Sequence, residues 1–71
     1  RMSHDIYARV EPANIDMLSK IIEAYEHLGI VSTLDRRQGL VVIRCTGDTR
    51  EDMLEILASL PFPIEQIEPP A

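Results

Sequence analysis

The positions of glycine and proline constrain this chain most strongly, because they divide it into six short segments. The breaks fall at Pro12, Gly29, Gly39, Gly47 and Pro61. Glycine ends helices and closes turns, whereas proline fits the first turn of a helix and stops a helix that reaches it. Each segment between two breaks is therefore expected to form one short helix or strand.

Four segments have the composition or the alternation of β-strands. Residues 6–10 alternate between two faces, and residues 30–34 are rich in β-branched side chains. Residues 40–45 are almost continuously apolar, which favours a central place in a sheet. A polar turn that closes at Gly39 joins these two strands, and residues 64–67 form a short last strand.

The two longer segments have the periodicity of amphipathic helices. In the first, apolar residues recur at spacings of three and four along residues 15–28, and Gly29 is expected to end the helix in the left-handed conformation. The second begins at Asp48, which forms a variant of the capping box with Glu51, and Pro61 stops it. The side chains expected in the core are Ile15, Met17, Leu18, Ile21, Ile22, Tyr25 and Leu28 from the first helix and Met53, Leu54, Leu57 and Leu60 from the second.

The resulting order of elements, βαββαβ, predicts an α+β fold. Right-handed crossovers place both helices on one face of a four-stranded antiparallel sheet with strand order 4-1-3-2, which is the ferredoxin-like arrangement. All 71 residues are expected to form one domain, with a flexible N-terminal end at residues 1–4 and a C-terminal tail at residues 69–71.

The net charge of −5 belongs entirely to the last third of the chain. Up to Gly47, six basic side chains balance six acidic ones, whereas from Asp48 onward six acidic side chains stand against Arg50 alone. This acidic part repels phosphate backbones and anionic lipid, so neither nucleic acid nor a membrane surface is an expected partner. No stretch has the length of a membrane span, and no signal peptide is expected at the start.

A single cysteine, Cys45, excludes an intrachain disulfide, and a bacterial cytoplasm is the expected compartment. Without a disulfide or an indicated cofactor, so short a chain buries barely enough apolar surface to offset the entropy lost on folding. Self-association supplies the missing stability in many such domains. We therefore expect a homo-oligomer.

The face of the sheet that no helix covers is the expected contact surface. Alternation directs Ile6, Ala8, Val10, Val41, Ile43 and Cys45 towards the helices. The opposite face, which is the predicted interface, carries Tyr7, Arg9, Leu40, Val42 and Arg44. A monomer is expected to leave these side chains in water, and the apolar middle and basic margin of the face are typical of a contact surface. Two alternatives remain open, namely an exposed patch on a monomer and the docking of a larger partner protein.

The start of the first helix provides a candidate site for a small effector. Pro12 occupies the first turn, and Glu11 or Asn14 is expected to cap the free amides. Such a helix start attracts an anion, while the carboxylates of Glu11 and Asp16 suit an ammonium group. A zwitterion such as an amino acid fits this mixture, so Glu11, Asn14 and Asp16 are the predicted ligand-binding residues.

In element order and length, residues 5–68 resemble the ACT-like regulatory domains. Positions 10–15, Val-Glu-Pro-Ala-Asn-Ile, share with that family an acidic residue and a proline ahead of an apolar helix, but contain no glycine. The resemblance implies a small domain that pairs with a second copy and binds a small effector, often an amino acid. The chain is also similar to small stand-alone bacterial domains of unknown function with this layout.

No group of residues has the composition of a catalytic centre. His27 is expected to be a surface or capping residue near a helix end, and Cys45 a small core side chain. The carboxylates that begin the second helix are expected to form a solvated face rather than a cation site, and Arg36 and Arg37 a solvated turn. No catalytic residue, metal ligand or cofactor is assigned, and an enzyme is the least expected class.

Overall fold

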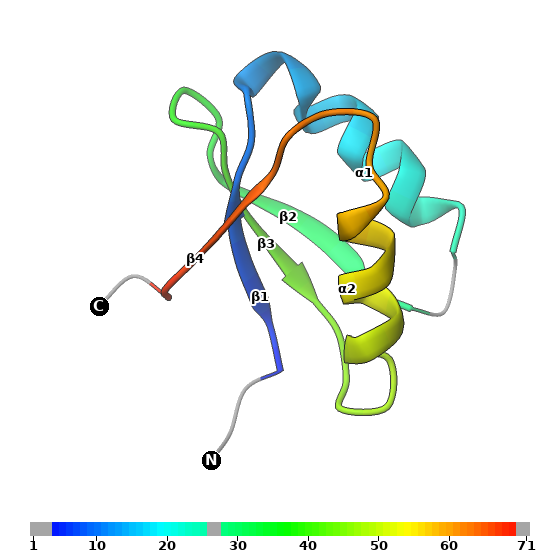
Figure 1. Ribbon diagram of the computed structural model, residues 1–71. Coiled ribbons are helices and arrows are strands. Elements are labelled where there is room, and N and C mark those ends of the chain that lie inside the picture. Colours follow the sequence, from blue (N-terminus) through cyan, green and yellow to red (C-terminus); the bar gives the residue numbers. More distant parts are fainter. Residues whose placement is uncertain (1–3, 26–27, 70–71) are drawn as a thin grey trace.

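The strands and helices follow one another along the chain in the predicted order βαββαβ (Figure 1). The computed structural model describes residues 4–25 and 28–69. Its strands are β1 (Ile6–Arg9), β2 (Ile30–Asp35), β3 (Leu40–Arg44) and β4 (Glu65–Ile67). Its helices are α1 (Ile15–Glu23), preceded by the short 3-10 helix η1 (Pro12–Asn14), and α2 (Arg50–Ala58). The α+β ferredoxin-like fold is therefore confirmed.

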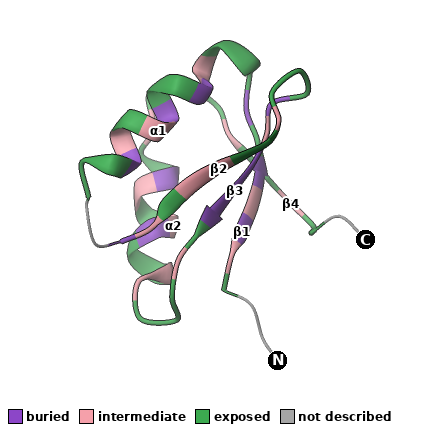
Figure 2. Cartoon of the chain, turned by 180° about the vertical axis from the view of Figure 1, so that it is seen from behind, coloured by how far each residue is buried: buried purple, intermediate pink, exposed green. Residues whose placement is uncertain are grey.

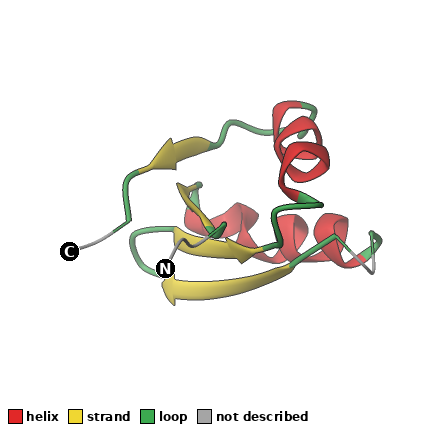
Figure 3. Cartoon of the chain, turned by 90° about the horizontal axis from the view of Figure 1, so that it is seen from below, coloured by secondary structure: helices red, strands yellow, loops and turns green. Residues whose placement is uncertain are grey.

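The four strands form one antiparallel sheet in the order β2-β3-β1-β4, which is the predicted order read from the other edge. β1 pairs with β3 along its whole length, from Ile6 opposite Ile43 to Arg9 opposite Leu40. A loop of residues 59–64 carries the chain from α2 to β4 (Figure 3). β4 pairs with β1 on the side opposite to β3. β1 and β3 are consequently the central strands, and β2 and β4 are the edges.

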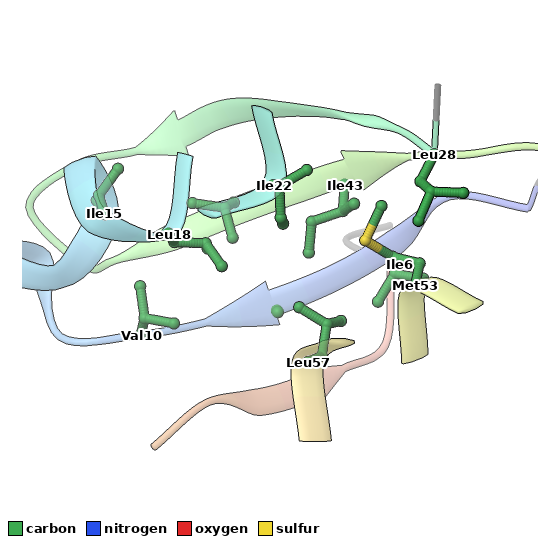
Figure 4. Close-up of a cluster of buried hydrophobic side chains, with 11 residues drawn as sticks. Ile6, Val10, Ile15, Leu18, Ile22, Leu28, Ile43, Met53 and Leu57 are labelled. Carbon is green, nitrogen blue, oxygen red and sulfur yellow. The ribbon is translucent and has the colours of Figure 1, made fainter. Parts of the chain in front are cut away.

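Both helices pack on the same face of this sheet. One buried cluster joins alternate residues of β1 and β3 to one side of each helix (Figure 4). Each member is at most 8% exposed, because the helices exclude water from this face. The members of the cluster are Ile6, Ala8, Val10, Ile15, Leu18, Ile22, Leu28, Val41, Ile43, Met53 and Leu57. The alternation predicted for β1 and β3 is thereby confirmed.

Helix α1 ends earlier than predicted. Its last residue is Glu23, and Ala24 follows as the C-cap. Gly29 does not have a positive φ, so the left-handed helix end expected there is wrong. Glycine is needed at this position for another reason, because a Cβ would lie 2.7 Å from both the Arg44 carbonyl oxygen and Met53 Cε. The chain passes too close to β3 and α2 for a larger residue.

Two side chains expected in the core lie at the surface. Met17 is 50% exposed, because Ile15, Leu18 and Ile22 already form the side of α1 that faces the sheet and Met17 lies beside this stripe. Tyr25 is 43% exposed, since it follows the end of α1 and no longer continues the helical stripe. These two predictions are wrong. The side chains of Met17 and Tyr25 form exposed apolar surface on and just beyond α1.

The predicted capping box of α2 is also wrong. The N-cap is Thr49 rather than Asp48, and no side chain caps the helix there. The Thr49 hydroxyl accepts a hydrogen bond from the Thr46 amide at 3.1 Å and so stabilises the turn before the helix instead. Asp48 belongs to this turn, which is why α2 begins at Arg50.

Gly39 closes the turn between β2 and β3, as predicted. Its φ is 73°, a conformation that L side chains rarely adopt. The Val10 amide donates a hydrogen bond to the Gly39 carbonyl at 2.9 Å, so this turn is tied to the end of β1. The Asp35 carboxylate accepts hydrogen bonds from the amides of Arg37 and Gln38, at 3.0 and 3.3 Å, and fixes the other side of the turn.

Candidate interaction surfaces

We call the sheet surface opposite the helices the open face. Strand register places its side chains, because residues directly opposite one another in an antiparallel pair point to the same side. Outside the register shift between Thr33 and Asp35, the open face consists of Tyr7, Arg9, Ile30, Ser32, Leu40, Val42, Arg44, Glu65 and Ile67. All five residues of the predicted interface lie on it. Their common placement is confirmed, while their role in an interface remains a prediction.

Val42 differs from its expected exposure. It lies outside the buried cluster beneath the helices, yet it is only 1% exposed. Its neighbours on the adjacent strands are Tyr7 and Ser32, and it is a short side chain in the middle of the sheet. The three middle residues of β3 are all buried, and Val42 is the one among them that belongs to the open face (Figure 2). The expectation that a monomer leaves Val42 in water is wrong, because flanking side chains of the sheet itself cover it.

The two arginines of the open face are paired within the chain. Arg9 Nη1 lies 3.8 Å from Glu65 Oε1, and Arg44 Nη1 lies 3.7 Å from Asp5 Oδ2. Exposed pairs of this kind contribute little to stability, on the order of 0.5 kcal/mol each. They do change the electrostatics, since the basic margin expected from the sequence is neutralised by carboxylates of the same chain.

The edge strand β2 carries the most exposed apolar side chains of the sheet. Ile30 is 66% exposed and Leu34 is 47% exposed. The register with β3 shifts between Thr33 and Asp35, as at a β-bulge. The strand contains no proline and no lysine, which are two devices that commonly prevent edge strands from pairing. Sequence reasoning missed Ile30 and Leu34 as surface residues, although the predicted strand order already placed this segment at an edge.

The predicted ligand-binding residues Glu11, Asn14 and Asp16 lie in and beside η1 and the first turn of α1, and their role in binding remains a prediction. Asp16 Oδ1 lies 3.4 Å from Arg36 Nη2, in an ion pair between α1 and the β2–β3 turn. Glu11 and Asn14 precede η1 and α1, but neither makes a side-chain cap, so the expected cap is wrong. Pro12 does begin the helical segment, as predicted.

Glu11 instead lines a hollow with residues from other elements. The hollow has a volume of about 420 Å³ and lies where the end of β1 meets the β2–β3 turn and the start of β4. Its polar lining combines Arg9, Glu11, Gln38 and Glu65. It therefore offers one cation, two carboxylates and an amide to a ligand, without Asn14 or Asp16.

Cys45 has a neutral and partly covered thiol. It lies just beyond β3 and packs against the buried cluster, as expected for a small core residue. Its Sγ donates a hydrogen bond to the His4 carbonyl oxygen at 3.1 Å. Burial raises the pKa of the thiol, Arg50 opposes this shift and Asp5 adds to it. A nucleophilic cysteine needs the opposite shift.

The described residues include no group of three or more His, Cys, Asp or Glu side chains that could hold a metal ion. His27 lies outside them. Within the same ranges, no helix has the length and apolarity needed to cross a membrane.

The chain is similar to a family of known proteins. Residues 8–64 match a family model described as "Domain of unknown function (DUF4911)". No curated protein and no solved structure matches the chain. The matched range runs from β1 to the residue before β4 and so covers most of the fold.

Proposed function

The chain belongs to the DUF4911 family, and we propose that it is a non-enzymatic domain that associates with a second copy of itself through the edge of β2 and the adjoining open face. The observation that carries this proposal is the exposure of Ile30 and Leu34 on an edge strand of six residues. An unpaired strand edge presents backbone amides and carbonyls that a second strand can bind.

A symmetric pair suits this edge. Two copies of β2 that pair about a twofold axis present the same surface to each other, so each exposed apolar side chain of one copy meets β2 of the other. The pairing would join two four-stranded sheets into one continuous sheet. Burial of Ile30 and Leu34 from both copies would then add to the hydrogen bonds between the backbones.

The open face next to β2 supports the same contact electrostatically. Arg44 on β3, the strand beside β2, is already paired with Asp5, so a second copy at this edge meets little uncompensated positive charge. The acidic side chains of α2 belong to the helical layer on the other face of the sheet. On β3, next to this edge, Leu40 is half-buried and has apolar area left to cover, whereas Val42 has almost none.

The decisive variant is Ile30→Lys combined with Leu34→Lys. Lysine on an edge strand opposes strand pairing, and both positions are exposed enough for a monomer to tolerate it. Analytical ultracentrifugation should show a dimer for the wild type and a monomer for the double variant. Met17→Lys is the matched control, because Met17 is a similarly exposed apolar side chain on α1, and it should leave the dimer intact.

A wild type that stays monomeric at high concentration contradicts self-association. In that case the open face would be available to a larger partner protein, which is the alternative function. Capture of such a partner by the wild type, and its loss with Tyr7→Glu, would then support the alternative.

We further propose that the hollow at Glu11 binds a small zwitterion such as an amino acid. The mixed lining supports this, since Glu11 suits an ammonium group and Arg9 suits a carboxylate, which can compete with its weak exposed pair to Glu65. A thermal-shift screen of amino acids should identify a compound that raises the melting temperature of the wild type but not of Glu11→Gln. If no amino acid raises it, the effector proposal is wrong and the self-association proposal is unaffected.

A further inference from the structure

A groove runs between the two helices, in the layer on the other side of the sheet from the open face. Its volume is about 530 Å³. Ile21 and Tyr25 line it from the side of α1, and Ile56 and Leu60 line it from the side of α2. Two carboxylates of α2, Asp52 and Glu55, belong to the same lining.

The apolar lining of this groove is incompletely buried. Tyr25 is 43% exposed, and Ile21, Ile56 and Leu60 are only half-buried. On α1, Met17 and Ile21 lie one turn apart beside the stripe that faces the sheet, and Tyr25 follows just after the end of the helix. Helix α1 therefore has more apolar surface than the core of one chain uses.

Within the part of the chain that the structure describes, the charge beside the groove is negative and has no ion-pair partner. Asp52 and Glu55 are exposed and one helical turn apart, and neither takes part in an ion pair with any described residue. No lysine or arginine is among the described residues that line the groove. The ion pairs found within residues 4–25 and 28–69 use Arg9, Arg36 and Arg44, in other parts of the fold.

We propose that this groove binds a basic amphipathic helix of a partner protein, with its apolar side chains between α1 and α2 and its lysines or arginines against Asp52 and Glu55. An apolar groove with an acidic rim is complementary to such a helix in both hydrophobicity and charge. A second copy of this chain is a poor occupant, because its own helical layer would bring a second set of these carboxylates to the contact. The proposal is independent of self-association, which uses the opposite side of the sheet.

The first test uses a fluorescently labelled peptide of about 14 residues, long enough for four helical turns, built from leucine and lysine with one apolar stripe. Fluorescence anisotropy should show binding to the wild type with a Kd on the order of 10 μM, weakened by added salt. A peptide of the same composition, with its leucines distributed around the helix, should bind at least tenfold more weakly.

The rim is tested with Asp52→Asn combined with Glu55→Gln, which should weaken binding about fivefold to tenfold. The matched control is Asp48→Asn combined with Glu51→Gln, which removes the same charge near the start of α2 but from side chains that do not line the groove. This control should change the Kd less than about twofold. Circular dichroism establishes that each variant is folded.

The apolar lining is tested with Tyr25→Ser, a change at an exposed position that should also weaken binding of the peptide. Ile67→Ser on the open face is its control and should leave the Kd unchanged. The proposal is overturned if the wild type does not bind the peptide, or if the redistributed peptide binds as tightly. It is equally overturned if the two pairs of charge substitutions weaken binding to the same extent. A change in the oligomeric state of the free protein in the groove variants would overturn it as well.

Discussion

At the scale of single residues, Gly39 shows how a local backbone conformation can hold distant segments together. Its positive φ closes the β2–β3 turn, and its carbonyl accepts a hydrogen bond from the Val10 amide. A Cβ at this position would overlap the Val10 carbonyl oxygen, a backbone atom that cannot rotate away. Gly39→Ala should therefore lower the free energy of unfolding by about 3 kcal/mol, measured by urea denaturation.

Gly47 is the matched control for that substitution. Its φ is not positive, and the described atoms nearest to a Cβ there belong to the His4 imidazole, 3.2 Å away, which is a side chain able to move. Gly47→Ala should cost less than about 1 kcal/mol. Equal losses for the two variants would contradict the role assigned to the Gly39 conformation.

Cys45 provides a prediction about pH at the same scale. Burial raises the pKa of its thiol, so the folded chain retains this proton at a pH where the unfolded chain has begun to lose it. The contribution to stability is complete below the unfolded pKa and is lost as pH rises through the folded pKa. Alkylation by iodoacetamide should therefore require a higher pH in the native protein than in urea, and the reverse order would contradict the assignment.

At the scale of elements, helix α1 has apolar side chains both in the stripe that faces the sheet and beside it. Leu18 lies in this core stripe with no exposed surface, whereas Met17, its neighbour in the chain, is half exposed. Leu18→Ala should lower the free energy of unfolding by about 2 to 5 kcal/mol, because it leaves a cavity between the helix and the sheet. Met17→Ala should cost about 0.5 kcal/mol or less, and urea denaturation of both variants checks the difference.

At the scale of the whole molecule, a domain of 71 residues with a single cysteine has few ways to gain stability beyond its own core. If two copies pair through β2, unfolding separates them and the melting temperature depends on concentration. Each tenfold rise in protein concentration should raise the melting temperature of the wild type by about 5 °C. Calorimetry should find no such dependence for Ile30→Lys with Leu34→Lys, and a constant wild-type value would contradict pairing.

The sequence by itself determined the order of the elements, the class of fold and the strand order of the sheet. It also determined which side chains of β1 and β3 face the helices and which share the open face. These features follow from a period of two or of 3.6 residues and from breaks at glycine and proline, all of which are local properties of the chain. For the same reason Tyr7, Arg9, Leu40, Val42 and Arg44 were correctly grouped on one surface.

Only the tertiary structure decided how that surface and the predicted effector site are composed. It buried Val42, paired Arg9 with Glu65 across two strands, and paired Asp16 of the predicted effector site with Arg36. It also gave Gly29 its close contact with β3 and α2. Each of these outcomes depends on which distant segments become neighbours in space, and periodicity within one segment carries no information about the side chains that the next strand places beside it.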